Sequence, residues 1–419
     1  MKSLNNKEDG AALIGLVFIL GLAFTTYVLT TYRPLNIKAE RSKQTAQALM
    51  EAKAALIGWS VKNDVAPGRL PCPEDTSKIG TEQEGQAASS CTLPAIGRLP
   101  FRTLGIGDLR DGNSDRLWYV ISEGFRANPP TTYINSQTQA QLTVDGIANS
   151  AVAIVFSPGT PLGSQQRTIP TSASPPVITD YLDLTNNNGD NSFISRDLSS
   201  NFNDQLLVIS HKDLFQPVEK RVLRDVKSCL DNYAQNSGGK YPWAAPVTDI
   251  TNYTGVPDTT FGRIPTNIVT TGMLFGIPTI RDPAMLSSWS TVTGCIFSAN
   301  TTYWYTNSWR ELVFYQLASG YRPQPFIGAA CGGTCLSISG SGNPYNGTGT
   351  YRAVVAMARG VMGTQNRASK TDASQYLEGI NVHSSPSPSL VFETYQPIDQ
   401  QYANVNDLVL CIDANNNCK

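Results

Sequence analysis

The chain is poor in charge and in histidine. Charged residues make up 16% of its 419 residues, the formal net charge is −1, and there are two histidines, His211 and His383. Nucleic-acid binding needs a strongly basic surface, so we expect no nucleic-acid partner. Both histidines lie far from any cysteine pair in the sequence, so a metal site with three or four such ligands is not expected either.

The short motifs that mark common enzymes are also missing. The sequence contains no G-x-S-x-G elbow, H-E-x-x-H pair, P-loop or G-x-G-x-x-G run. His211 stands next to Ser210, after an apolar run, but a histidine at a strand-to-helix junction usually has a structural role. We therefore predict a protein that is not an enzyme, with no catalytic residue and no required cofactor.

Glycine, proline and cysteine are well represented instead. The 34 glycines and 26 prolines indicate a loop-rich exterior, and the eight cysteines are an even number. Short cysteine loops close easily, and an oxidising compartment keeps them closed, so we predict structural disulfides, with metal binding as the alternative. The candidates are Cys72 with Cys91, Cys331 with Cys335, Cys411 with Cys418, and the remaining Cys229 and Cys295.

The N-terminal region carries the strongest pattern. A polar leader, residues 1–10, ends at Gly10, and an apolar run of about 21 residues follows, which is long enough to cross a bilayer as a helix. The candidate cleavage point between Gly10 and Ala11 precedes this run, whereas a secretory signal is cut after its apolar core. We expect a transmembrane and N-terminal helix over residues 11–44, placing the chain in the inner membrane with its head in the periplasm.

The helix is expected to continue beyond the apolar run. Pro34 lies just after the run and predicts a kink or a break. Further on, apolar residues recur at spacings of three and four, which predicts an amphipathic helix up to about residue 61. The stripe consists of Leu49, Ala52, Leu56 and Trp59.

This arrangement resembles the N-terminal region of type IV pilins and of type II secretion pseudopilins, over about residues 7–60. The resemblance implies cleavage by a prepilin peptidase after Gly10, methylation at Ala11 and assembly into a filament through the apolar helix. Gly15 departs from the family, because most pilins carry a glutamate there, although pseudopilins proposed for filament tips also lack it. The residues assigned to the filament helix are Leu13, Ile14, Gly15, Phe18, Phe24 and Pro34.

The sequence after the N-terminal helix indicates an internal duplication. Segment 151–167 parallels 351–367 at a constant offset, and five further pairs of segments match in the same order. We predict an α+β fold in which the long helix is followed by two tandem modules, 45–215 and 216–419, each a helix packed on an antiparallel sheet, as in a pilin head. The second helix is expected to have Pro217 in its first turn and Asp213 near its cap. The expected strands are 117–121, 152–156, 206–209, 312–315, 353–357 and 408–412.

Two further groups of residues were considered as sites. Asp111, Asn113 and Asp115 place oxygen atoms at alternating positions, as calcium loops do, but an Asx-rich turn that caps a strand is the interpretation we favour. Four arginines recur in both modules and are expected to tie loops to the sheets rather than to bind a ligand. They are Arg98, Arg167, Arg263 and Arg367.

These patterns predict a minor, low-copy or tip subunit of a type IV pilus or type II secretion filament. Its expected partners are other pilin or pseudopilin subunits, the inner membrane, prepilin peptidase and a tip adhesin, and in a filament it would be extracellular. The alternative is a membrane-anchored periplasmic or surface protein whose two heads bind a polymer or take part in cell adhesion, without entering a filament.

Overall fold

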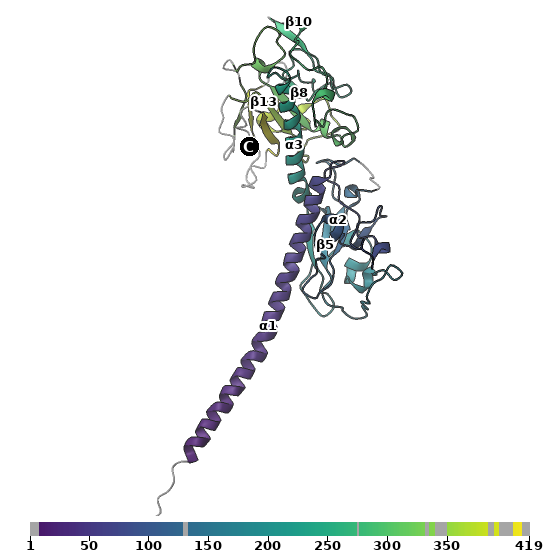
Figure 1. Ribbon diagram of the computed structural model, residues 1–419, viewed down its shortest axis with the longest axis vertical. Helices are drawn as coiled ribbons and strands as arrows, with labels where there is room; N and C mark the ends of the chain where they lie inside the picture. The colour runs from purple at the N-terminus through teal and green to yellow at the C-terminus, as the bar shows by residue number, and fades with distance from the viewer. Residues whose placement is uncertain are drawn as a thin grey trace, which may run out of the picture.

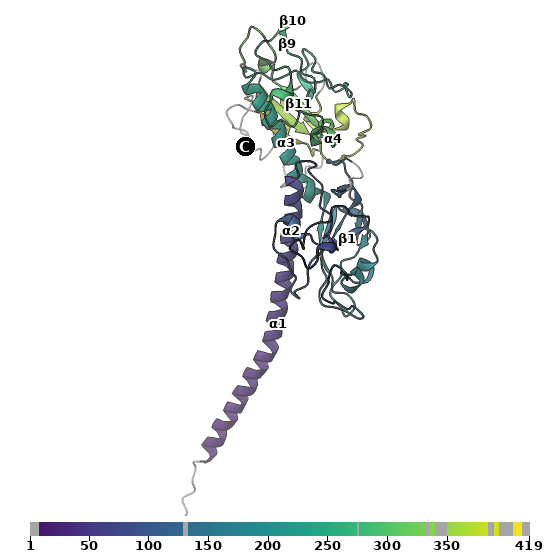
Figure 2. The ribbon, with the colours of Figure 1, turned by 45° about the vertical axis from the view of Figure 1, so that its right-hand side comes forward.

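The computed structural model describes residues 8–128, 133–274, 276–331, 335–339, 350–383, 389–393 and 405–412, with the side chains of helix α1 described for residues 16–26 and from 37 onward. The fold is α+β. Helix α1 (Glu8–Lys62) extends away from two globular heads, which lie one beyond the other at its C-terminal end (Figure 1). The view in Figure 2 shows the same separation between the free part of α1 and the heads.

Helix α1 is continuous over 55 residues and runs through Pro34, where we expected a kink or a break. Its C-terminal part is amphipathic, as the spacing of its apolar residues predicted. Ala48, Leu49, Ala52 and Leu56 are buried against the first head, whereas Trp59 is half-buried.

The predicted membrane crossing is corrected by the structure. Within the residues whose side chains are described, no helix is both long enough and apolar enough to span a membrane. The transmembrane part of the predicted fold and the single-pass inner-membrane location are therefore wrong by this measure.

The first head is built on a four-stranded antiparallel sheet with the order β1-β2-β5-β7. Helix α1 covers one face of the sheet through β5 and β7. A three-stranded layer, β4-β3-β6, covers the other face and packs Leu142 and Phe193 against Trp118 and Phe156. The strands are β1 (Ala95–Arg98), β2 (Trp118–Ile121), β3 (Leu142–Val144), β4 (Ile147–Ala151), β5 (Ala153–Ser157), β6 (Ser192–Phe193) and β7 (Gln205–Ile209).

The second head repeats this plan. Its four-stranded antiparallel sheet has the order β8-β11-β13-β15, and helix α3 (His211–Gln235) covers one face through β13 and β15. Strands β12 and β14 pair in parallel, as β3 and β6 do in the first head. The strands of the sheets are β8 (Phe261–Arg263), β11 (Val313–Leu317), β12 (Ser337–Ser339), β13 (Ala353–Met357), β14 (Val391–Glu393) and β15 (Leu408–Ile412).

Equivalent residues of the two heads make equivalent contacts. The matched segments around Val155 and Val355 form the third strand of each sheet. The hydroxyl of Tyr119 donates to the Pro71 carbonyl at 3.2 Å, and that of Tyr315 donates to the Pro242 carbonyl at 3.1 Å. The second head adds a hairpin of β9 (Thr271–Leu274) and β10 (Ile277–Arg281), which lies at the far end from α1 (Figure 1).

The helix of the second head begins earlier than expected. Ser210 caps it, and Asp213 completes a capping box at the third helical position, so Pro217 lies inside α3 rather than in its first turn. Strand β7 therefore runs directly into α3. A single apolar core extends from Leu49 of α1 through Phe215 and Val222 of α3 to the second sheet, which joins the two heads.

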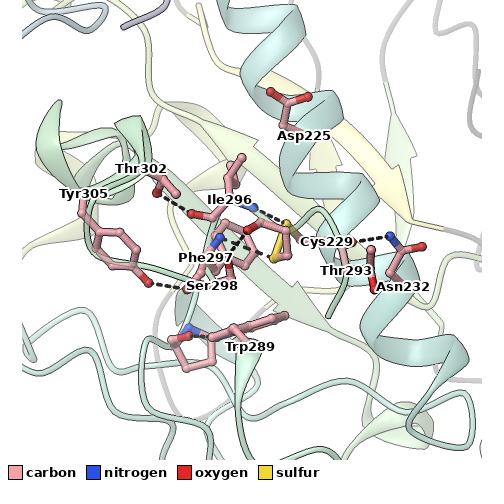
Figure 3. Close-up of a disulfide and its surroundings, with 12 residues drawn as sticks. Asp225, Cys229, Asn232, Trp289, Thr293, Ile296, Phe297, Ser298, Thr302 and Tyr305 are labelled. Atoms are coloured by element: carbon pink, nitrogen blue, oxygen red, sulfur yellow. Dashed lines mark hydrogen bonds between the residues drawn. A yellow bond between two sulfur atoms is a disulfide. The ribbon is translucent and has the colours of Figure 1, made fainter. Parts of the chain in front are cut away.

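The disulfides follow the predicted local pairing. Cys72 is bonded to Cys91, Cys331 to Cys335, and Cys229 of α3 to Cys295. Figure 3 shows Cys229 bonded beside Ile296 and Phe297, within a group of aromatic side chains. Cys411 is also disulfide-bonded, but Cys418 lies outside the described residues.

Two short helices complete the described elements. Helix α2 (Phe101–Leu104) follows β1 and contacts α1. Helix α4 (Tyr303–Thr306) precedes β11 and places the Tyr303 hydroxyl against the Asp225 carboxylate of α3, at 2.6 Å. Both helices add contacts between the long helices and the loops of their heads.

Candidate functional site

The free part of α1 exposes large apolar side chains on every side. In the described stretch 16–26, seven of them are between 55% and 72% exposed. At 100° per residue they point in all directions around the helix axis, and a helix that is apolar all round is normally covered on all sides. The residues are Leu16, Val17, Phe18, Ile19, Leu20, Leu22 and Phe24.

The hydroxyl groups in this stretch are satisfied within the helix. Thr25 donates to the Gly21 carbonyl at 2.9 Å, and Thr26 donates to the Leu22 carbonyl at 2.7 Å. Such hydrogen bonds leave these threonines with no need of a polar partner outside the helix. The stretch is therefore suited to an apolar environment along its whole described length.

The predicted processing and filament residues fall on this helix. Phe18 and Phe24 are 72% and 68% exposed. Gly10, Ala11, Leu13, Ile14, Gly15 and Pro34 belong to the backbone of α1, but their side chains lie outside the described residues.

The loop 111–115, considered above as a calcium loop or an Asx-rich turn, holds α1 to the first head. The carboxylate of Asp111 accepts hydrogen bonds from the main-chain N–H groups of Asn113 and Asp115, at 2.8 and 3.0 Å, and from the Ser157 hydroxyl at 2.7 Å. Asp115 forms an ion pair with Arg167 at 2.5 Å. Asp111 thus has the geometry of an Asx turn, and protein groups engage both acidic side chains.

The same loop touches α1 at the point where the helix leaves the head. The Gly112 N–H donates to the Thr45 hydroxyl at 3.0 Å, and the Gln44 amide donates to the Asp111 carbonyl at 3.1 Å. A Cβ atom on Gly112 would lie 2.2 Å from the Arg41 carbonyl oxygen. Only glycine allows this close approach.

The recurring arginines tie loops to the sheets, mostly through backbone carbonyls. Arg263 is fully buried and donates to the carbonyls of Val247 and Lys370, at 2.9 and 2.8 Å. Arg167 and Arg367 donate to carbonyls of their own loops, those of Pro158 and Arg359 among them. Arg98 differs, because it lies 3.7 Å from the carboxylate of Glu74.

Each head also contains a buried pair of acidic side chains, which we call the acid pairs: Asp183 with Asp204, and Glu378 with Asp407. Oδ2 of Asp204 accepts from the Asp183 N–H at 2.8 Å and from the Asn186 amide at 2.9 Å. Oδ2 of Asp407 accepts from the Glu378 N–H at 2.9 Å and from the Asn381 amide at 3.0 Å. The two networks are equivalent, bond for bond.

The other member of each pair is also held in the same way. Asp183 accepts from the Gln165 amide at 2.9 Å, and Glu378 accepts from the Gln365 amide at 2.7 Å. The recurring arginines, Arg167 and Arg367, bind backbone carbonyls, and the glutamines reach these carboxylates. Repetition of the same residues in both modules was the signal in the sequence, although it gave no role to Asp204 and Asp407.

One member of each acid pair has a raised pKa. Burial raises the pKa of Asp204 to about 7, and the neighbouring charge of Asp183 adds to the increase. Burial raises the pKa of Asp407 well above its usual range, and the charge of Glu378 acts in the same direction. Asp204 and Asp407 are therefore the groups in these pairs that retain a proton most readily.

His211 lies at the contact between the two heads. Its ring packs 4.5 Å from that of Phe215, and burial lowers the pKa of its imidazole. Nearby, the buried carboxylate of Glu219 forms an ion pair with Arg359 at 2.6 Å. These contacts indicate that His211 packs in the interface between the two modules.

Comparison with known proteins identifies no relative. No family model, no curated protein and no solved structure matches this chain. Its function is therefore inferred from the geometry of α1 and of the two heads.

Proposed function

We propose that this chain is a non-enzymatic subunit of a pilin-like filament, of the type IV pilus or type II secretion kind, which assembles through helix α1. The observation that carries the proposal is the exposed stretch 16–26, which is apolar on every side and projects away from both heads (Figures 1 and 2). Covering each large apolar side chain contributes about 1.5–3 kcal/mol, so like helices packed around the stretch would stabilise an assembly.

The arrangement of the heads supports a low-copy or terminal position in such a filament. The second head lies beyond the C-terminal end of α1, so a lattice made only of this chain would have to fit a second head for every helix (Figure 1). In addition, α3 follows β7 directly and has no free apolar extension of its own. The chain therefore has one assembly helix for two heads. This suits a subunit at the end of a filament whose other subunits are single-headed pilin-like proteins.

A binding role of the heads without a filament is the second candidate. The hairpin at the far end from α1 favours it, because Ile277 and Ile280 of β10 are 65% and 59% exposed. Exposed apolar side chains grouped at one end of a molecule are typical of contact surfaces.

The first test is the N-terminus of the protein isolated from its native cells, determined by mass spectrometry. We expect a mature chain that begins at Ala11, which would indicate cleavage by a prepilin peptidase. An intact Met1 in cells with an active peptidase would contradict the filament proposal and favour the binding role.

Cross-linking provides an independent test of the same proposal. A photo-reactive residue at Phe18 should form cross-links to filament subunits, because this side chain is 72% exposed on the apolar stretch. The matched control is a photo-reactive residue at Ile169, which is 91% exposed on a loop of the first head. Equal cross-linking at both positions would argue against assembly through α1.

A further inference from the structure

The two acid pairs join the same three segments in each head. Asp204 and Asp407 stand directly before β7 and β15, the last strands of the two sheets. Their carboxyl groups bind the loop residues Asp183 and Glu378 and the amides of Asn186 and Asn381.

The two asparagines carry the connection to the outer layer. Asn186 exchanges two hydrogen bonds with the backbone of Ile194, next to β6, at 2.8 and 3.1 Å. Asn381 exchanges two with the backbone of Glu393 in β14, both at 2.8 Å. One carboxyl group thus holds the last strand, the loop and the outer strand together in each head.

The donors around each pair are too few for two charged carboxylates. Oδ2 of Asp204 and of Asp407 accepts two hydrogen bonds, but no donor among the described residues reaches Oδ1 of either residue. Both residues are almost completely buried, at 2% and 0% exposure. A second buried negative charge is costly when Oδ1 has no donor, whereas a proton on Oδ1 neutralises that charge.

The surrounding charges differ between the heads. Asp204 faces Asp183 and the positive charge of Arg167, which is itself paired with Asp115. Asp407 faces Glu378 and the positive charge of Arg367, whose described hydrogen bonds go to backbone carbonyls. The two pairs are therefore built alike but are not expected to release their protons at the same pH.

We propose that the acid pairs are proton-held latches, in which a proton on Asp204 or Asp407 keeps the outer layer closed on its sheet. Loss of that proton leaves two negative charges in one buried site and favours opening of the loop and the outer strand. The inference concerns the heads alone and does not depend on the proposed filament.

Linkage fixes the direction and the pH window. When the latch opens, the carboxyl group returns to water and to an ordinary pKa of about 4. Because burial raises the pKa of Asp204 to about 7 in the closed head, the opening constant should rise about tenfold per pH unit between about pH 4 and 7 and then level off. In the second head the opening constant should also rise with pH, because burial raises the pKa of Asp407 well above its usual range.

Hydrogen exchange of the full chain, followed by mass spectrometry and corrected for the intrinsic pH dependence of exchange, tests the proposal. Peptides that cover residues 178–194 and 203–209 should open more readily at pH 7 than at pH 5, by about fiftyfold. Peptides over 373–383 and 405–412 should also open more readily as the pH rises. Opening that does not depend on pH in the unmodified protein would overturn the proposal without any substitution.

Substitutions then assign the effect to the two pairs. Asp204→Asn replaces the protonated carboxyl by a neutral group of the same shape, so it should remove the pH dependence in the first head only. Asp407→Asn should do so in the second head only. Asp197→Asn, on the exposed loop before β7, is the matched control and should change neither. Retention of the full pH dependence in both Asp204→Asn and Asp407→Asn would also overturn the proposal.

Discussion

Arg221 of α3 donates a hydrogen bond of 3.1 Å to the main-chain carbonyl of Asn63, which lies just past the last residue of α1. The same guanidinium donates to the Val61 carbonyl and forms an ion pair with Asp64 at 2.6 Å. The carbonyl groups at a helix C-terminus have no partners within the helix and carry a partial negative charge. The helix of the second head thus caps the helix of the first.

Replacing this arginine should weaken the contact between the heads. We expect Arg221→Met to lower the free energy of unfolding by about 1–2 kcal/mol, because the carbonyls at the end of α1 lose their charged donor. Urea unfolding measures the change. Arg224→Met is the control, since Arg224 is exposed on α3 and donates only within its own helix among the described contacts. An equal loss in both variants would contradict the capping role.

Phe215 is expected to couple the two heads. Its ring lies 5.9 Å from Phe125 of the first head and 6.4 Å from Trp309 of the second, and it is buried. Phe215→Ala should cost about 3–5 kcal/mol and separate one calorimetric unfolding transition into two. Phe326→Ala serves as the control, because that side chain is 68% exposed. A single transition at an unchanged temperature would show that Phe215 does not couple the heads.

Gly112 should be needed for the attachment of α1 to the first head. In Gly112→Ala the new methyl group would meet the Arg41 carbonyl oxygen at 2.2 Å, so the loop must move away from the helix. We expect faster amide exchange at residues 41–45 and a loss of about 1–3 kcal/mol, typical of overpacking. Gly107→Ala is the matched control, since its Cβ would meet nothing within 4 Å. Unchanged exchange in Gly112→Ala would refute this contact.

The overall stability should depend on pH through Asp204. Because burial raises the pKa of this carboxyl to about 7, the folded state holds the proton more tightly than the unfolded state does. The stabilisation is present in full below about pH 4, is lost progressively up to about pH 7, and amounts to about 4 kcal/mol as an upper limit. Unfolding of the unmodified protein and of Asp204→Asn at pH 5 and pH 8 measures it. The difference between the two proteins should shift with pH, and a constant difference would contradict the assignment.

The sequence was most informative where the two modules repeat each other. The central strands β5 and β13 were predicted because their apolar runs match at a fixed offset, and β7 and β15 because each is a short apolar run that recurs in both modules after an Asn-Asp pair. Residues that recur in both copies could be recognised as structurally important, which a single copy of the module would not have shown.

Other elements could not be predicted in this way. Strands β1 and β8, of four and three residues, were not predicted, because the Gly-Arg pair and the nearby proline in each segment are typical of turns. The outer strands β3, β6, β12 and β14 have too few residues to show the alternation of apolar and polar side chains that identifies a strand in a sequence. The pairing of these segments is decided by contacts that are distant in the sequence.

The acid pairs also could not be predicted from the sequence. Asp204 and Asp407 were visible as repeated residues, but their burial depends on Asn186, Asn381 and the loops that fold over them. The membrane prediction failed for a different reason. It rested on the length of one apolar run, whereas within the described residues no helix is both long enough and apolar enough to span a membrane.

The continuous core between the heads has a mechanical consequence. Because the apolar cluster runs from α1 through α3 into the second sheet, the two heads and the attached half of α1 form one stiff body. Helix α1 is about 80 Å long, so its free half acts as a lever arm on that body. A force applied to the free end would turn both heads together and swing the β9–β10 hairpin, at the opposite end, through the widest arc (Figure 1).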